Sequence, residues 1–207
     1  MRFIGITGGV GAGKSEILSY LARLPHTRVV LADEIAHELM EPGTDCYNQI
    51  CNTFIGEEIF GPEGGFDRKK LASVIFTDEK KRAQMNAIVH PAVKQYVINT
   101  AKEERRRGRI QLLVLEAALL IEEHYDEICD ELWYIYADEG VREERLVASR
   151  GYTKEKVRQI FASQLNESIY RKSCAVVIDN NGTVEETLQQ IADVLERMNL
   201  QPVTFLK

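Results

Sequence analysis

The sequence predicts an α/β fold with a five-stranded parallel sheet and helices on both faces. Short apolar runs alternate along the 207 residues with segments whose apolar residues recur at helical spacing. Residues 110–116 (IQLLVLE) are apolar almost throughout, which is typical of a parallel strand buried on both faces. A glycine-rich loop follows the first apolar run and precedes the first helical pattern. These observations together favour a sheet whose strands are joined by helices.

The glycine-rich loop, residues 8–15 (GGVGAGKS), follows the predicted strand 2–7 and fits the phosphate-loop pattern G-x-x-x-x-G-K-[ST] at every fixed position. Its glycines let backbone N–H groups turn towards a phosphate, and the dipole of the following helix favours the same anion. The expected contacts with ATP come from Gly9, Val10, Gly11, Ala12, Gly13, Lys14 and Ser15. Lys14 brings a cation to the outer phosphates, and the Ser15 hydroxyl is placed to bind Mg²⁺. The loop therefore predicts binding of a nucleoside triphosphate.

A second strand is predicted over residues 28–32 (RVVLA), and a helix follows until Pro42-Gly43 stops it. Asp33 lies between the two, at the sheet edge where open α/β folds bind ligands. The residue has two compatible interpretations. It is the N-cap of the helix, which is a common use of aspartate and the preferred interpretation from the residue alone, or it faces a ligand.

Residues 44–107 show helical patterns, a loop at 56–66 and no strand pattern, so we expect a partly inserted helical subdomain. His90-Pro91 is expected at the end of one helix and the start of the next, because proline suits a first helical turn. A histidine such as His90 is, by itself, more often packed than bound to a ligand. The basic cluster at residues 105–109 is interpreted as the solvated end of a helix.

Three further strands are expected at residues 110–116, 132–137 and 175–178, the first ending in Glu116, which could orient Mg²⁺. Two helices joined at Gly151-Tyr152 separate the last two strands. They carry four arginines, Arg142, Arg145, Arg150 and Arg158. As a cluster, these cations favour contact with a transferring phosphoryl group, although any one of them could be solvated surface charge. An amphipathic helix over residues 184–198 is expected to cover the sheet.

The composition argues against several other classes of protein. With 26 basic and 32 acidic residues the net charge is −6, which disfavours general nucleic-acid binding. No apolar run is long enough to cross a membrane, and the first strand begins at once, so we expect a cytoplasmic protein without a signal peptide. The four cysteines include no C-x-x-C pair, and we expect reduced thiols and no metal bound to them.

Beyond the loop, several stretches together match one known family. They are residues 7–15 (TGGVGAGKS), 32–37 (ADEIAH), 66–71 (FDRKKL), 119–122 (LLIE) and 177–182 (VIDNNG), with Asn86, His90-Pro91, Arg145-Leu146, Arg150 and Gln164. Through them the chain resembles the dephospho-CoA kinases along almost its entire length. The phosphate loop alone is common to many families. The acid after the second strand, the His-Pro pair and the Ile-Asp-Asn-Asn-Gly ending, in this order, are far more particular.

The resemblance implies phosphorylation of the ribose 3′-hydroxyl of dephospho-CoA by ATP with Mg²⁺. We expect a monomer or weak oligomer, although no pattern in the sequence determines the oligomeric state. It implies a nucleotide-binding core (about 1–43, 110–138 and 172–207), a helical CoA-binding subdomain (about 44–109) and a lid (about 139–171). Asp33 corresponds to the family's proposed general base, which reverses the preference for a mere cap. Arg68, His90, Pro91 and Leu119 correspond to acceptor-binding positions, Arg145 and Arg150 to lid arginines, and Asn180 and Gly182 to the adenine end of ATP.

The chain departs from the family pattern at several positions. Leu31 replaces a frequent acid, Ala118 stands at a usual proline, and Arg142 lies near a usual glutamine. The lid also has one extra residue between Arg145 and Arg150. From the residues alone, a kinase for another small acceptor remains the nearest alternative. A GTP-hydrolysing switch is less consistent, since D-x-x-G at residues 179–182 lies after the last strand and no Asn-Lys-x-Asp motif is present.

Overall fold

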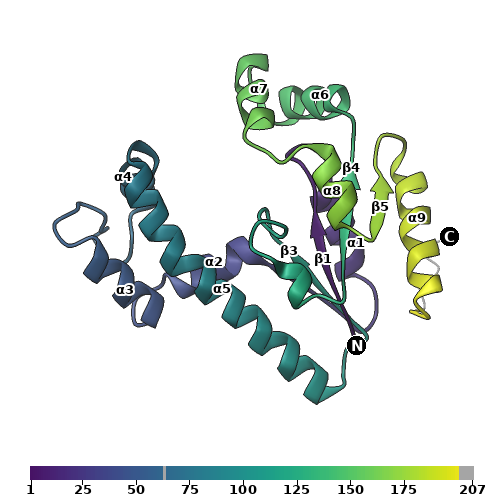
Figure 1. Ribbon diagram of the computed structural model, residues 1–207, viewed down its shortest axis with the longest axis horizontal. Helices are drawn as coiled ribbons and strands as arrows, with labels where there is room; N and C mark the ends of the chain where they lie inside the picture. The colour runs from purple at the N-terminus through teal and green to yellow at the C-terminus, as the bar shows by residue number, and fades with distance from the viewer. Residues whose placement is uncertain (63, 201–207) are drawn as a thin grey trace. The chain divides into compact units, whose positions relative to one another are not determined.

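The computed structural model describes residues 1–62 and 64–200 and has the predicted alternation of strands and helices (Figure 1). The strands are β1 (Arg2–Thr7), β2 (Thr27–Leu31), β3 (Leu112–Glu116), β4 (Glu131–Tyr136) and β5 (Val176–Asp179). The helices are α1 (Lys14–Ala22), α2 (Ala32–Leu39), α3 (Asp45–Thr53), α4 (Arg68–Thr77), α5 (Glu79–Arg107), α6 (Glu139–Arg150), α7 (Lys154–Ala162), α8 (Glu167–Ser173) and α9 (Val184–Arg197). Each predicted strand is confirmed, within one or two residues at its ends.

The five strands form one sheet in the order β2-β3-β1-β4-β5, and β1 pairs with β3 and β4 in parallel. The register aligns the carboxyl ends of these strands. Ile6 of β1 lies opposite Glu116 of β3, and Thr7 lies opposite Tyr134 of β4. Because the phosphate loop follows Thr7 directly, the last residues of β3 and β4 lie beside its start.

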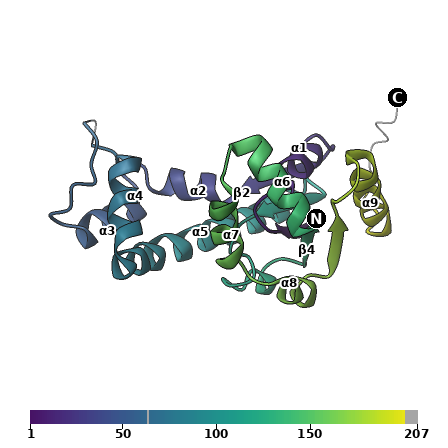
Figure 2. The same cartoon turned by 90° about the horizontal axis from the view of Figure 1, so that it is seen from above.

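The sheet is buried on both faces, as its continuous apolar strands predict. Phe3, Ile4 and Ile6 of β1 and Trp133 and Ile135 of β4 are fully buried. Helices α1 and α8 lie on opposite faces of the sheet, and α9 lies along β5 (Figures 1 and 2). The side chains that α1 and α9 bury are Ile17, Leu18 and Leu21, and Thr187, Ile191, Val194 and Leu195. This packing holds the phosphate loop between the buried strand β1 and the helix α1, which buries one apolar face.

The chain divides into two compact units. The first contains Met1–Val30 and the residues from Glu104 onwards, and it includes the sheet, α1 and α6–α9. The second, Leu31–Glu103, contains α2, α3, α4 and most of α5, and a single antiparallel bridge between Phe60 and Phe66 closes its loop. The helical unit therefore begins thirteen residues before the predicted boundary at about residue 44, and it includes Asp33.

The predicted helix break at His90-Pro91 is wrong, because α5 continues through Pro91 as one helix of 29 residues. A proline inside a helix costs about 3 kcal/mol, since it removes one backbone hydrogen bond and crowds the preceding turn. Buried side chains recur every four residues on both sides of it, at Met85, Val89, Val93, Val97 and Ala101. Burying each valine contributes about 1.5–3 kcal/mol, so the stripe as a whole outweighs the proline.

Two short elements were not predicted, the single-turn helix Tyr125–Glu127 and the seven-residue α8. Both are too short for apolar periodicity to reveal them. Among the described helices, even α5 lacks the apolar stretch that crossing a bilayer would need.

Candidate active site

The phosphate loop connects β1 to α1, and its backbone is shaped by glycine. Gly11 has φ 85°, and Gly13, the N-cap of α1, has φ 87° and ψ 19°, a left-handed conformation that side chains rarely allow. In the described chain, no side chain caps the start of α1. The N–H groups of its first turn and the positive end of its dipole therefore suit an anion.

Lys14 and Glu116 meet at the mouth of this loop. The Lys14 ammonium donates a hydrogen bond of 2.8 Å to the carbonyl of Gly8, and it lies 3.8 Å from Oε1 of Glu116. Both side chains are largely shielded from solvent, with exposures of 17% and 19%. The parallel register explains the encounter, because Glu116 ends the strand next to the one that leads into the loop.

The residues around Lys14 fit a magnesium ion bound with a nucleotide. Mg²⁺ prefers oxygen ligands and usually keeps several waters while bridging phosphate oxygens. Ser15 is exposed at the first turn of α1, and the carboxylate of Glu116 lies within the same mouth. A hydroxyl and a nearby carboxylate match the donors that phosphate-loop proteins use for this ion. No cluster of three acidic, histidine or cysteine side chains for a metal occurs among the described residues.

Asn180, after β5, supports the loop from a second side. Its buried side chain donates a hydrogen bond of 2.7 Å to the carbonyl of Ala12 and accepts one of 2.8 Å from the hydroxyl of Thr187. A Cβ atom on Gly13 would lie 2.3 Å from Nδ2 of Asn180, so this close approach also requires glycine. Gly182 has a similar constraint, because a Cβ there would lie 2.2 Å from Oε2 of Glu186. Of the two predicted adenine-side residues, Asn180 therefore packs against the loop, whereas Gly182 packs against Glu186 in the first turn of α9.

The arginines of α6 differ in how they relate to the loop. Arg145 donates a hydrogen bond of 2.9 Å from Nη2 to the carbonyl of Asn180. Arg142 is more buried and donates from Nε to the carbonyl of Val10 at 3.0 Å. Arg150 is exposed at the end of α6, where its guanidinium lies 6.0 Å from the ring centre of Tyr152. Of the two lid arginines expected to reach the transferring phosphoryl group, Arg145 lies beside the loop and Arg150 lies at the helix end.

Two buried polar atoms near the loop have no hydrogen-bond partner among the described residues. They are the hydroxyl of Thr7, at the end of β1, and Nη1 of Arg145. This nitrogen would lie 3.6 Å from a Cβ atom on Gly13, which places it against the loop. Buried polar groups in native proteins nearly always have a partner, so an orphaned one requires an explanation, and a catalytic role or a bound ion is one of them.

The predicted acceptor-side residues lie mostly in the second unit. Asp33 is the second residue of α2 and is exposed. Its N-cap interpretation is wrong, because the N-cap is Leu31 and no side chain in the described chain caps this helix. Arg68 is the exposed first residue of α4, and His90 and Pro91 lie in the middle of α5, with His90 half-buried.

Leu119 belongs to the first unit, in the segment after β3. Its side chain is 39% exposed, so part of its apolar surface is open to contact. The neighbouring Leu120 is fully buried, and the carbonyl of Leu119 accepts a hydrogen bond of 2.9 Å from Glu123. The segment is therefore anchored while Leu119 points outwards.

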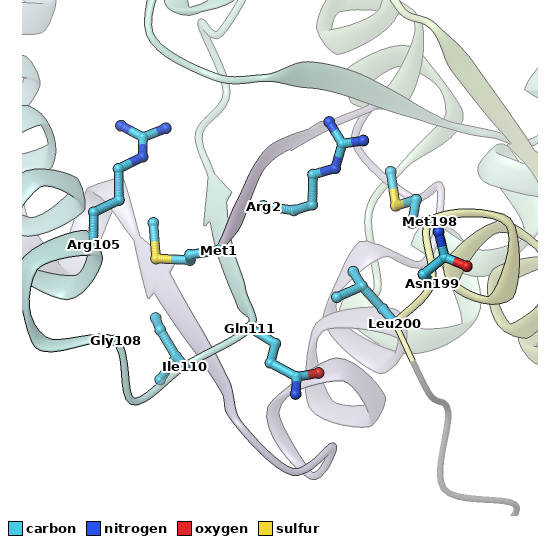
Figure 3. Close-up of a pocket in the computed structure, with 9 residues that line it drawn as sticks. All are labelled: Met1, Arg2, Arg105, Gly108, Ile110, Gln111, Met198, Asn199 and Leu200. Atoms are coloured by element: carbon cyan, nitrogen blue, oxygen red, sulfur yellow. The ribbon is translucent and has the colours of Figure 1, made fainter.

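A surface hollow of about 690 Å³ lies elsewhere on the first unit (Figure 3). It is lined by Met1, Arg2, Arg105, Gly108, Ile110, Gln111, Met198, Asn199 and Leu200. These residues surround the amino end of β1, whereas the phosphate loop follows its carboxyl end. The hollow is thus separate from the phosphate loop.

A family model described as dephospho-CoA kinase matches residues 2–186. A dephospho-CoA kinase from Shouchella clausii is 39% identical over 196 residues, which cover 94% of this chain and 97% of that protein. The chain belongs to the dephospho-CoA kinase family. A crystal structure from Thermus thermophilus has a TM-score of 0.75 at 27% identity, with 95% of this chain and 97% of that one covered. The fold is also that of a Campylobacter jejuni dephospho-CoA kinase (TM-score 0.69, 18% identity, 96% and 98% covered).

For a dephospho-CoA kinase sequence, the geometry adds two contacts that sequence reasoning did not predict. One is the pair of Lys14 and Glu116, which only the order of the strands brings together. The other is the contact of Arg142 with the loop, which the sequence includes only as one arginine in a cluster of four. The spacing of Arg142 and Arg145, three residues apart on a helix, was the available signal that both face the same way.

Proposed function

We propose that this chain transfers the γ-phosphoryl group of ATP to the ribose 3′-hydroxyl of dephospho-CoA, giving CoA and ADP. The observation that carries the proposal is the phosphate loop of a dephospho-CoA kinase family member, with Lys14 held between the Gly8 carbonyl and Glu116. Transfer of this kind requires mainly positioning and electrostatic stabilisation, and the loop supplies backbone donors, a helix dipole and a cation for both.

Each residue has a distinct part in the proposed mechanism. The loop from Gly9 to Ser15 binds the β- and γ-phosphates, and Lys14 leaves Gly8 to neutralise the charge that spreads over the transferring group. Ser15 and Glu116 would hold Mg²⁺, which would supply further positive charge at the transferring group. Nη1 of Arg145, which has no hydrogen-bond partner among the described residues, is available to the nucleotide.

Asp33 accepts the proton of the 3′-hydroxyl as the oxygen attacks the γ-phosphorus. Its exposed carboxylate has no hydrogen bond or ion pair with another described residue, so nothing in that part of the chain competes for it. The helical unit, with Arg68, His90 and Pro91, and the exposed Leu119 bind the acceptor. Arg150, at the end of α6, joins the site when the lid over residues 139–171 closes and excludes water.

The experiment measures ADP formation by the purified protein with ATP and Mg²⁺, comparing dephospho-CoA with a panel of nucleosides and nucleoside monophosphates. We expect turnover with dephospho-CoA alone, and phosphorus NMR of the product should show a 3′-phosphate. Preference for another acceptor would replace the proposal with the nearest alternative, a kinase for a different small molecule. Hydrolysis of GTP without an acceptor would indicate a nucleotide-dependent switch instead.

A further inference from the structure

The guanidinium of Arg142 joins three segments of the first unit. It is 8% exposed and donates from Nε to the carbonyl of Val10 in the phosphate loop, at 3.0 Å. Nη2 donates to the side-chain oxygen of Gln164, in the segment after α7. The guanidinium carbon lies 4.1 Å from the ring centre of Phe161, at the end of α7. One side chain of α6 therefore connects the phosphate loop to the far end of the α6–α7 hairpin (residues 139–164).

These three neighbours of Arg142 are all neutral. No carboxylate among the described residues forms an ion pair with it, and burial lowers the pKa of its guanidinium. The exposed carboxylate of Glu139 partly offsets this effect through its charge, without forming an ion pair. A buried cation is costly when no anion pairs with it, and it becomes more favourable when one binds close to it. The phosphate loop is the anion-binding element that Arg142 contacts, so the charge of Arg142 favours an occupied loop.

Gly9 provides an independent sign that Arg142 belongs to the loop. The phosphate-loop pattern leaves this position variable, and Gly9 lacks the positive φ of Gly8, Gly11 and Gly13. A Cβ atom on Gly9 would lie 2.4 Å from the guanidinium carbon of Arg142. The need for glycine at this position therefore comes from Arg142 and not from the backbone. Because the clash is with the end of a flexible side chain, alanine here would displace the guanidinium without breaking the fold.

We propose that Arg142 is a positioning residue for the phosphate loop, and that its contacts with Val10 and Gln164 couple nucleotide binding to docking of the α6–α7 hairpin. Arg142 fixes the conformation of the Gly9–Val10 segment. When ATP binds to the loop, the same side chain stabilises the docked position of the hairpin. The inference rests on the proposed function only in that the loop must bind ATP. The role proposed for Arg142 is distinct from the lid roles that the family resemblance gives to Arg145 and Arg150. The resemblance assigns no role to Arg142, because the family usually has a glutamine near this position.

The first test is a double-mutant cycle of Gly9→Ala and Arg142→Ala, with ATP affinity measured by calorimetry. Each single change should weaken ATP binding about tenfold, the usual order for losing a hydrogen bond to a charged group. The double variant should bind ATP no more weakly than the weaker single variant, because both changes remove the same contact. Arg142→Lys should not restore affinity, since lysine cannot donate to Val10 and Gln164 from a rigid fork.

The matched control is Lys154→Ala, which removes another cationic contact within the hairpin. Lys154 of α7 pairs with Glu143 of α6 at 3.1 Å and is 65% exposed, so its loss should leave ATP affinity unchanged. Thermal unfolding of every variant checks the fold. If Arg142→Ala proves unstable, Gly9→Ala still displaces the guanidinium and carries the test alone.

The second test measures hydrogen exchange of residues 139–164 with and without saturating ATP. ATP should slow exchange in the hairpin of the wild-type protein and of Lys154→Ala, but not in Arg142→Ala or Gln164→Ala. A purely structural role would change exchange equally in the presence and absence of ATP. Additive losses in the cycle, single variants that bind ATP within twofold of wild type, or retained ATP-dependent protection in Arg142→Ala would each overturn the inference. If the wild-type protein itself does not bind ATP, the proposed function fails, and this inference fails with it.

Discussion

The substitution Asp33→Asn is expected to separate catalysis from folding. Asp33 lies in the first turn of α2, is exposed and caps no helix. The folding cost of the change is therefore the loss of one negative charge near the positive end of a helix, about 0.3–1 kcal/mol. We expect thermal unfolding to shift only slightly and ATP to bind through the loop as before.

The rate should respond far more strongly than the stability. Loss of a positioned general base lowers turnover by about 10²–10⁴-fold, which corresponds to about 3–5 kcal/mol of activation free energy. The assay is ADP formation with both substrates saturating, repeated over a range of Mg²⁺ concentrations. Glu34→Gln is the matched control, because Glu34 is exposed in the same helical turn and has the same relation to the helix dipole. It should keep near-normal turnover.

Three results would refute the role of Asp33 as general base. Near-normal turnover of Asp33→Asn at ordinary Mg²⁺ would mean that the base lies elsewhere, and Glu116 would become the next candidate. Full rescue by excess Mg²⁺ would identify Asp33 as a metal-site residue, with the proton leaving by another route. Equal losses in Asp33→Asn and Glu34→Gln would instead indicate that the turn of α2 matters for its charge and not for its chemistry.

Three further predictions concern the other parts of the proposed site. Lys14→Ala should nearly abolish turnover while thermal unfolding changes little, because Lys14 serves the phosphates; activity within a few-fold of wild type would contradict the loop assignment. His90→Ala should weaken dephospho-CoA binding in calorimetry much more than ATP binding, and equal losses, or a loss of folding, would return His90 to a packing role. Burial raises the pKa of the Cys174 thiol to about 12, so below that pH it stays protonated. At pH 8, iodoacetamide should therefore modify the native protein at Cys174 far more slowly than the urea-unfolded protein, as mass spectrometry of peptides would show; equal rates would count against the buried thiol.

Local features of the sequence were sufficient to predict most of the fold. The phosphate loop, the five strands and the final helix depend on short-range patterns: fixed glycine spacing, continuous apolar runs and a 3.6-residue period. Predictions made from local patterns failed where packing between distant parts of the chain outweighed the local preference. Pro91 suggested a helix end, yet the buried stripe from Met85 to Ala101 sustains α5 across it.

Site residues divide in the same way. Lys14 and Ser15 follow from the motif, and Asp33 was singled out by its place after a strand and by family resemblance, although its predicted capping role was wrong. The sequence alone could not predict which arginine between β4 and β5 contacts the phosphate loop. That depends on which guanidinium the tertiary structure buries against the loop.

The sequence by itself determined that this chain has a nucleotide-binding loop on a parallel α/β sheet, because those signals are encoded by neighbours along the chain. Only the tertiary structure decided that Glu116 lies beside Lys14 and that Arg142 lies over Gly9. Both pairs join residues more than a hundred positions apart. Their proximity is set by strand order and helix packing, which depend on the burial of the whole sheet and not on any local pattern.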